Sequence, residues 1–154
     1  MNYSIYLTDA CNMNCKYCYE KNKHYNREIS FENIKKIIDK EIKNKTKESV
    51  ITFFGGEPLI KKDLIYEIAN YINSKKSKTK FLYNMTTNGT LIDDEFIKFF
   101  IQNDFISLSL SIDGNSNSQN ENRITKNGKT TYEIVEKNAK KLLNKPDIVV
   151  AVPV

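Results

Sequence analysis

The sequence predicts an α/β fold, a partial (β/α)6 TIM-type barrel that is incomplete, with about five parallel strands and four helices. Short apolar runs alternate with segments of helical periodicity along the chain. Their connections are short, which favours parallel strands joined by right-handed crossovers. Residues 106–112 alternate apolar residues with serines, which indicates a strand with one polar face. A barrel lumen or cleft that holds a ligand explains this polar face better than a second helix layer.

The first half of the chain contains two strand and helix units. The first strand is predicted at residues 3–8 and the first helix at residues 31–44, where Ser30 can cap the amino end. Residues 50–54 are a compact apolar run and form the second strand. The second helix begins near Asp63, because apolar residues recur on one helical face after it.

The second half repeats this order. A third strand is predicted at residues 81–86, a third helix after Asp93, and a fourth strand at residues 106–112. A polar loop rich in Asn and Ser follows. Thr130 and Glu133 stand at capping-box spacing and open the fourth helix, and residues 148–152 form the fifth strand.

We expect one domain over residues 1–154, because 154 residues with 40% hydrophobic content suffice for a single core. The sequence stops inside an apolar strand, with no closing helix and no sixth strand, so we expect a domain truncated at its carboxyl end. No apolar run reaches the length of about 20 residues of a membrane helix, and the amino terminus lacks a signal peptide. These features predict a cytoplasmic protein without a membrane partner.

The net charge of +5 raises the possibility of a nucleic-acid partner. The lysines, however, are spread along predicted helices among Asp and Glu, as in residues 35–43. A nucleic-acid surface requires a clustered basic patch with interleaved aromatic residues. We therefore expect solvated charged faces and no nucleic acid.

The three cysteines, Cys11, Cys15 and Cys18, lie in the loop after the first strand, and the rest of the chain has none. Such spacing points to metal or cluster ligation rather than to disulfides. Three thiolates can each bind a different iron of a [4Fe–4S] cluster and leave the fourth iron without a protein ligand. A zinc site completed by His24 remains an alternative on spacing alone. A ferredoxin-like electron carrier would need a fourth cysteine, which the sequence lacks.

Polar motifs follow the next three predicted strands, at the carboxyl ends where ligands of parallel sheets bind. Gly55-Gly56-Glu57-Pro58 offers close backbone approach to a ligand and a carboxylate for an ammonium group. Thr87 and Asn88 can line the same cavity. The end of the fourth strand contributes Ser109, Ser111 and Asp113, and Arg123 follows in the polar loop. The Arg123 guanidinium suits a planar carboxylate. Each motif alone is also compatible with an ordinary turn.

Together these motifs resemble the radical S-adenosylmethionine (SAM) superfamily, and within it the branch of anaerobic sulfatase-maturating enzymes and related peptide maturases (SPASM-type). The most specific element is Cys-x3-Cys-x2-Cys with Tyr17 before the last cysteine. The resemblance runs from about residue 3 to residue 152. It implies that the cysteines bind a [4Fe–4S] cluster and that the enzyme cleaves SAM reductively to a 5′-deoxyadenosyl radical, which abstracts hydrogen from a peptide or protein. An electron donor such as a flavodoxin or ferredoxin is implied as a partner.

The resemblance also implies roles for single residues. Tyr17 lies near the SAM adenine, and the Gly55–Pro58 motif binds the SAM amino group. Ser111 and Arg123 contact SAM, and Thr87, Asn88 and Gly89 match a recurrent Thr-Asn-Gly. Many members of the branch carry His where this chain has Gln119. A non-catalytic iron–sulfur or zinc domain is the alternative function.

Overall fold

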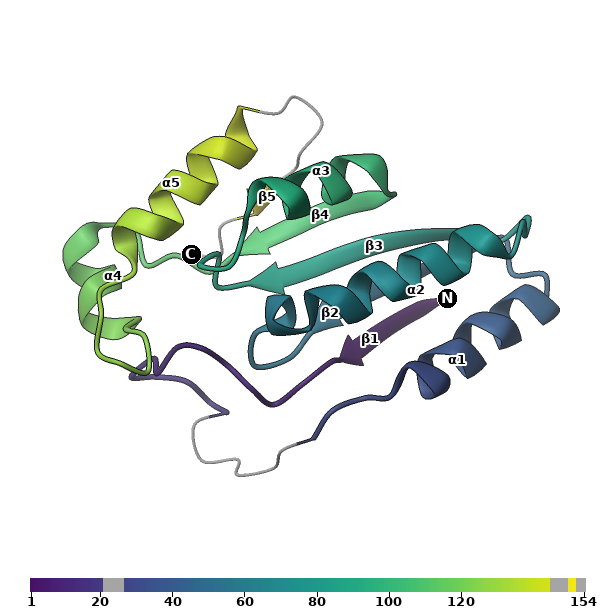
Figure 1. Cartoon of the computed structure of the whole chain (residues 1–154), viewed down its shortest axis with the longest axis horizontal. Helices are drawn as coiled ribbons and strands as arrows, with labels where there is room; N and C mark the ends of the chain where they lie inside the picture. Colours follow the sequence, from purple (N-terminus) through teal and green to yellow (C-terminus); the bar gives the residue numbers. More distant parts are fainter. Residues whose placement is uncertain (21–26, 145–149, 152–154) are drawn as a thin grey trace.

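The five strands form one parallel sheet in which each strand pairs with the strand before it, in the order β1-β2-β3-β4-β5 (Figure 1). This computed structural model describes residues 1–20, 27–144 and 150–151. A doubly wound sheet reverses its strand order at a switch point, whereas sequential order is that of a barrel. The prediction of an incomplete barrel is therefore confirmed. The strands are β1 (Asn2–Tyr6), β2 (Glu48–Phe54), β3 (Lys80–Thr87), β4 (Phe105–Leu110) and β5 (Val150–Ala151).

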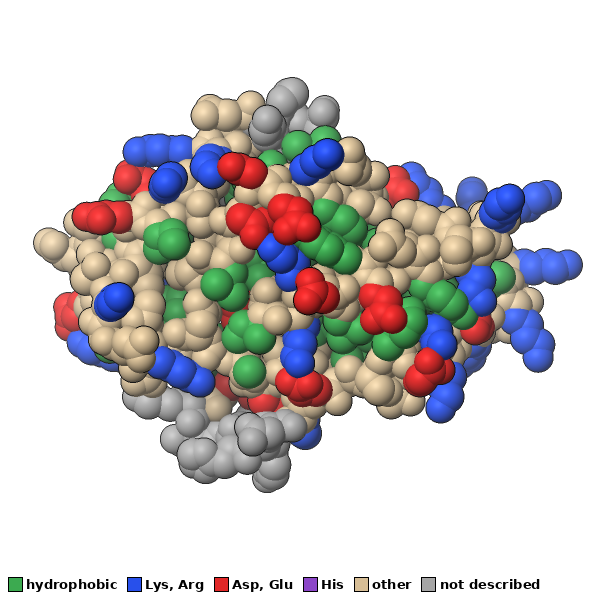
Figure 2. Space-filling model, in the orientation of Figure 1, with side chains coloured by type: hydrophobic (Ala, Val, Ile, Leu, Met, Phe, Trp, Pro, Cys, Tyr) green, Lys and Arg blue, Asp and Glu red, His purple; other side chains and the backbone are tan. Residues whose placement is uncertain are grey.

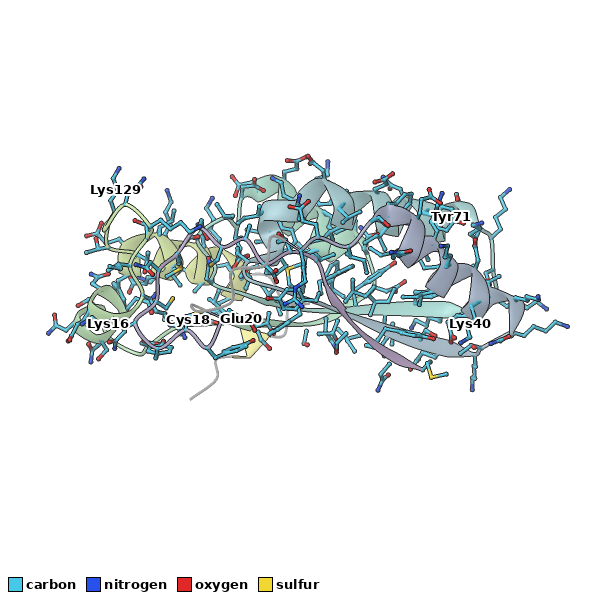
Figure 3. All side chains as sticks on the ribbon, turned by 90° about the horizontal axis from the view of Figure 1, so that it is seen from below. Lys16, Cys18, Glu20, Lys40, Tyr71 and Lys129 are labelled. Atoms are coloured by element: carbon cyan, nitrogen blue, oxygen red, sulfur yellow. The ribbon has the colours of Figure 1, made fainter. Side chains whose placement is uncertain are left out.

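The helices α1, α2, α3 and α5 pack on one face of the sheet, and the edge-on view in Figure 3 shows them on one side of the strands. The structure has helices α1 (Phe31–Lys43), α2 (Lys62–Ser74), α3 (Asp94–Gln102), α4 (Ser116–Asn122) and α5 (Tyr132–Leu143) within the described residues, and a 3-10 helix, η1 (Pro58–Lys61). The fully buried core side chains include Leu7, Ile34, Ile38, Ile51, Phe53, Ile65, Ile68, Met85, Phe96, Leu108, Leu110 and Leu142.

Two predicted helix starts are confirmed by their caps. The Ser30 side chain accepts a hydrogen bond from the Asn33 N–H at the start of α1, and Asp93 accepts one from the Phe96 N–H at the start of α3. Such caps satisfy backbone N–H groups that have no partner within the helix. The predicted cap of α5 is wrong, because Thr131 rather than Thr130 is its N-cap and the Thr131 hydroxyl is engaged elsewhere.

The polar segment after β4 contains the helix α4, which we predicted as a loop. Its Ser- and Asn-rich sequence has low helix propensity. Two contacts compensate for this. The Asn115 side chain caps the helix by accepting from the Ser118 N–H, and Gln119 is completely buried. Tertiary contacts therefore overrode the local preference.

Strand β4 contains an irregularity that the alternating pattern did not reveal. Tyr83 pairs with Phe105 but Asn84 pairs with Ser107, so Ile106 is an extra residue in β4. Such a bulge shifts the alternation by one residue. Phe105 consequently packs on the core, and Ile106, which the alternation of residues 106–112 would place on the apolar face, is 47% exposed. The serines do lie on the face opposite the helices, where the Ser107 hydroxyl donates to Asn84 Oδ1.

The described part of β5, Val150–Ala151, pairs with Leu108 and Ser109 of β4. The other predicted residues of that strand, 148, 149 and 152, lie outside the described residues, as does His24. None of the described helices is long and apolar enough to cross a membrane.

Basic and acidic side chains are interspersed over most of the face in Figure 2. Lysines extend from the end of the molecule where α1 and α2 finish. Lys40 and Lys43 lie in the last turn of α1, and Lys75 caps α2. Cations in these positions stabilise the negative ends of the helix dipoles.

Glu41 is a buried carboxylate within the stripe of α1 that faces the sheet. The Tyr3 hydroxyl donates to it at 2.7 Å and the Ser49 hydroxyl at 2.9 Å. The bond from Tyr3 is the largest cause that lowers the pKa of Glu41 below its usual value of 4.5, against the opposing effect of burial. Ionised Glu41 thus ties α1 to β1 and β2.

We predict that Glu41→Gln flattens the acid limb of the stability curve. A carboxyl whose pKa is lowered by folding contributes stability above its unfolded pKa, and this contribution is lost as the pH falls through the folded pKa. Between about pH 6 and about pH 3, urea midpoints of the variant should therefore fall less than those of the parent. The exposed Glu67→Gln on α2 is the control and should keep the parental slope. Equal slopes for all three proteins would contradict the role of Glu41.

Candidate functional site

The candidate site is a cavity of about 630 Å³ at the carboxyl ends of the strands. In Figure 3, Cys18 and Glu20 lie at this end of the sheet and Lys40 lies at the opposite end. Most of the predicted site residues line the cavity. They are Cys11, Cys15, Tyr17, Cys18, Gly55, Gly56, Glu57, Thr87, Asn88, Ser111 and Arg123.

Three predicted site residues are not part of the cavity lining. Pro58 is buried as the first residue of η1, and Ser109 lies on β4, two residues before Ser111. Asp113 does not line the cavity itself but forms hydrogen bonds with Tyr17 and Arg123, which do. Sequence reasoning also missed lining residues. Phe54 and Thr86 are on the polar face of the sheet, Met13 is inside the cysteine motif, and Asp9, Glu20 and Lys126 lie in loops whose course the sequence does not reveal.

The cysteine loop is held by backbone hydrogen bonds to the end of α4 and to the segment after it. The Asn14 N–H donates to the Ile124 carbonyl at 2.8 Å, and the Lys16 N–H to the Asn122 carbonyl at 2.9 Å. The Met13 side chain, 4% exposed, is buried in the middle of the loop. The loop is therefore anchored to the rest of the structure on both sides of Cys15.

The three thiols are partly buried and free of disulfides. Burial is the largest cause that raises the pKa of Cys11 and of Cys15 above the usual thiol value. For Cys11, the Met13 N–H opposes this effect by donating to the sulfur at 3.4 Å. Among the described residues, no trio of His, Cys, Asp and Glu side chains is placed to hold a single metal ion. A cluster is bound differently, because each thiolate binds its own iron.

Gly55 and Gly56 bring the end of β2 against the start of the cysteine loop. The Gly56 N–H donates to the Thr8 carbonyl at 2.8 Å, and the Glu57 N–H to the Ala10 carbonyl at 2.9 Å. A Cβ at Gly56 would lie 2.5 Å from the Ala10 oxygen, and one at Gly55 2.7 Å from the Thr8 oxygen. The glycines are thus required by backbone packing, and their close approach to a ligand stays a prediction, since both line the cavity.

The Glu57 carboxylate, 1% exposed, connects three segments at the base of the cavity. Its Oε1 accepts from the Thr87 hydroxyl at 2.6 Å and from the Leu59 N–H at 3.1 Å. Its Oε2 accepts from the Asn88 N–H at 2.8 Å. Burial raises the pKa of Glu57, and these bonds oppose the rise. The carboxylate therefore fixes the end of β3 relative to β2.

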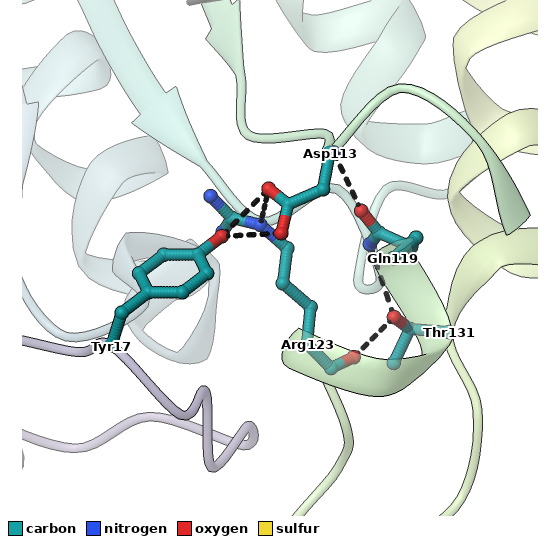
Figure 4. Close-up of polar contacts among 5 residues, drawn as sticks. All are labelled: Tyr17, Asp113, Gln119, Arg123 and Thr131. Carbon is teal, nitrogen blue, oxygen red and sulfur yellow. Dashed lines mark hydrogen bonds and ion pairs between the residues drawn. The ribbon is translucent and has the colours of Figure 1, made fainter. Parts of the chain in front are cut away.

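Tyr17, Asp113 and Arg123 form a cluster at the rim of the cavity (Figure 4). The Tyr17 hydroxyl donates to the Asp113 carboxylate at 2.6 Å, and the Arg123 Nε donates to Asp113 Oδ1 at 2.6 Å. The Arg123 guanidinium also lies 5.1 Å from the centre of the Tyr17 ring, in range of a cation–π interaction. Burial and, next, the bond to Asp113 raise the pKa of Tyr17. This cluster joins the cysteine loop to the end of β4.

Gln119 supports this cluster through hydrogen bonds to Asp113 and Thr131 (Figure 4). Its Oε1 accepts from the Asp113 N–H at 2.9 Å, and its Nε2 donates to the Thr131 hydroxyl at 3.1 Å. Thr131 in turn donates to the Arg123 carbonyl at 2.5 Å. Gln119, whose role the sequence left open, therefore fixes the backbone positions of Asp113 and Arg123.

Comparisons with known proteins agree with this geometry. The family model described as the radical SAM superfamily matches residues 5–153. An uncharacterized protein of Methanocaldococcus jannaschii is 38% identical over 70% of this chain and 37% of its own length. A serine-type anaerobic sulfatase-maturating enzyme of Bacteroides thetaiotaomicron is 35% identical over 80% of this chain and 31% of its own length. The chain thus spans about a third of these relatives.

A solved structure is also similar in fold. It is anSMEcpe with bound AdoMet and Cp18Cys peptide, which matches with a TM-score of 0.78 and 27% identity over 97% of this chain and 42% of that chain.

We predict that Gly56→Ala separates β2 from the cysteine loop. Its Cβ would meet backbone oxygens, which cannot rotate away, so overpacking should cost about 1–3 kcal/mol of the free energy of unfolding. Chemical denaturation measures this loss. Gly128→Asn is the matched control, because Gly128 has a positive φ that Asn tolerates and nothing within 4 Å of its Cβ position. A Gly56→Ala variant as stable as the control would contradict the packing role.

Proposed function

The chain belongs to the radical SAM superfamily, and we propose that Cys11, Cys15 and Cys18 hold a [4Fe–4S] cluster beside a SAM site in the cavity. The observation that carries the proposal is that three thiols, a buried carboxylate, a serine and an arginine from separate segments line this one cavity. When bound and reduced, the cluster would supply the electron that cleaves SAM into methionine and a 5′-deoxyadenosyl radical for hydrogen abstraction from the substrate.

The residues around the cavity fit the parts of SAM. Among the described residues, the guanidinium of Arg123 donates to Asp113 through its Nε alone, so its terminal nitrogens are available for the methionine carboxylate. Ser111 presents its hydroxyl to the same cavity. The Glu57 Oε2 accepts one bond and has a further lone pair for an ammonium group. Tyr17 lies at the rim, where its ring is available to the adenine.

The substrate is proposed to be a peptide or protein side chain. Support comes from the relative named as a sulfatase-maturating enzyme and from the anSMEcpe structure with a peptide. The polar face of the sheet, with Thr52, Asn84, Thr86 and Ser107, offers hydrogen-bond partners to such a substrate. A flavodoxin or ferredoxin in the cytoplasm is the proposed electron donor. The competing function is a non-catalytic iron–sulfur or zinc domain.

Anaerobic reconstitution with iron and sulfide separates these functions. The proposal expects about four irons per chain, an EPR signal after reduction that SAM perturbs, and release of 5′-deoxyadenosine. One tightly held zinc without iron would establish the zinc domain instead. An iron–sulfur protein whose EPR signal is indifferent to SAM would establish the non-catalytic domain.

We predict that Cys15→Ala abolishes cluster loading while the helical content stays near that of the parent. Two thiolates leave a second iron of the cluster without a protein ligand. The backbone bonds of Asn14 and Lys16 hold the loop independently of the side chain between them. Iron analysis and far-UV circular dichroism measure the two properties. Collapse of the helical signal would show that the thiol itself is structural.

Ser111→Ala and Ser109→Ala are a matched pair, because Ser109 lies on β4 and Ser111 directly follows the last residue of that strand. Only Ser111 lines the cavity, so its loss should remove one hydrogen bond to SAM, worth about 1 kcal/mol or roughly a fivefold rise in Kd. Ser109→Ala should leave the Kd unchanged. Calorimetric titration of the reconstituted protein with SAM measures both constants. A larger rise in Kd for Ser109→Ala than for Ser111→Ala would contradict the proposed contact between Ser111 and SAM.

A further inference from the structure

The sulfur of Cys11 differs from the other two cysteine sulfurs in its hydrogen bonds. It accepts from the Met13 N–H at 3.4 Å and from the Asn88 side-chain amide at 3.9 Å. Within the described parts of the chain, the sulfurs of Cys15 and Cys18 accept no such bond. The three thiols therefore differ in their surroundings, since the protein donates hydrogen bonds to the sulfur of Cys11 and not to the other two among the described residues.

The orientation of the Asn88 amide is determined by a closed network. Asn88 Oδ1 accepts from the Thr90 N–H at 3.0 Å and from the Thr90 hydroxyl at 2.7 Å. The Asn88 Nδ2 donates to Asn12 Oδ1 at 2.9 Å, and the Asn12 Nδ2 donates to the Thr90 hydroxyl at 2.8 Å. A reversed Asn88 amide would place oxygen against oxygen and nitrogen against a donor. The N–H groups of Asn88 must therefore face Asn12 and Cys11.

The backbone of Asn88 is fixed as well. Its N–H donates to the buried Glu57 carboxylate at 2.8 Å, and Asn88 itself is 8% exposed. On the other side, the Asn138 side chain of α5 donates to the Gly89 carbonyl at 2.8 Å. The amide is thus held rigidly next to a cluster ligand.

Hydrogen bonds to the sulfurs are among the factors that set the reduction potential of an iron–sulfur cluster. An N–H donor withdraws electron density from the thiolate and so stabilises the reduced cluster, which carries one more negative charge. We propose that Asn88 is a positioning residue that raises the reduction potential of the cluster through Cys11, and that it does not act as a contact to SAM. This inference rests on the proposed function, because it requires a cluster at the three cysteines.

The test is an EPR-monitored redox titration of the reconstituted protein without SAM. In Asn88→Ala the midpoint should become more negative, by about a tenfold change in the ratio of reduced to oxidised cluster, or ~59 mV for one electron. Asn88→Asp should move it further in the same direction, since a carboxylate adds negative charge. The Kd for SAM should change less than about twofold in Asn88→Ala.

Asn138→Ala is the control, because this buried side chain holds the same turn and touches no sulfur. Its midpoint should equal that of the parent. An equal shift in Asn138→Ala would overturn the proposal, since any disturbance of the turn would then suffice. An unchanged midpoint in Asn88→Ala also overturns it, and a Kd raised several-fold in that variant would assign Asn88 to SAM instead.

Should Asn88→Ala fail to hold iron, Thr90→Val supplies the second measurement. It keeps Asn88 but removes the shorter of the two bonds from Thr90 that orient its amide, so a smaller negative shift is expected and no shift would overturn the proposal. Failure of the proposed function has a different signature, because the parent protein itself would then assemble no [4Fe–4S] cluster or would assemble one whose EPR signal SAM does not perturb.

Discussion

The candidate site depends on the hydrogen bonds that the buried carboxylate of Glu57 accepts. A buried charge is costly unless hydrogen bonds replace its water, and here Thr87, Asn88 and Leu59 do so. The backbone N–H of the same residue donates to Ala10, directly before the first cysteine. One residue therefore fixes the ends of β2 and β3 and the start of the cysteine loop relative to one another.

The second support lies on the other side of the cavity. Asp113 joins Tyr17 of the cysteine loop to Arg123, and buried Gln119 holds the Asp113 backbone. Charge-assisted bonds of this kind are short and directional. With Glu57 at one side and Asp113 at the other, the cysteine loop is held at both ends. Such preorganisation is what a site needs if its cluster and ligand must meet in one geometry.

The sheet separates two environments. Its helix-covered face carries the apolar core, whereas the opposite face carries serines, threonines and asparagines along β2, β3 and β4. Parallel strands place all their carboxyl ends at one edge, so polar loop residues far apart in sequence meet there. The core thus supplies stability while the edge and the polar face remain available for chemistry.

The sequence by itself determined the alternating architecture, the cap at Ser30, the helix start after Asp93, and the group of motifs at the strand ends, because these depend on local periodicity and local hydrogen bonds. It gave no signal for α4, whose weak propensity is offset by the burial of Gln119, or for the bulge at Ile106, which depends on pairing with β3. Only the tertiary structure showed that Gly56 packs on Ala10 and that the Asn88 amide faces Cys11. These contacts join residues more than 40 positions apart, and their geometry is set by the register of the whole sheet.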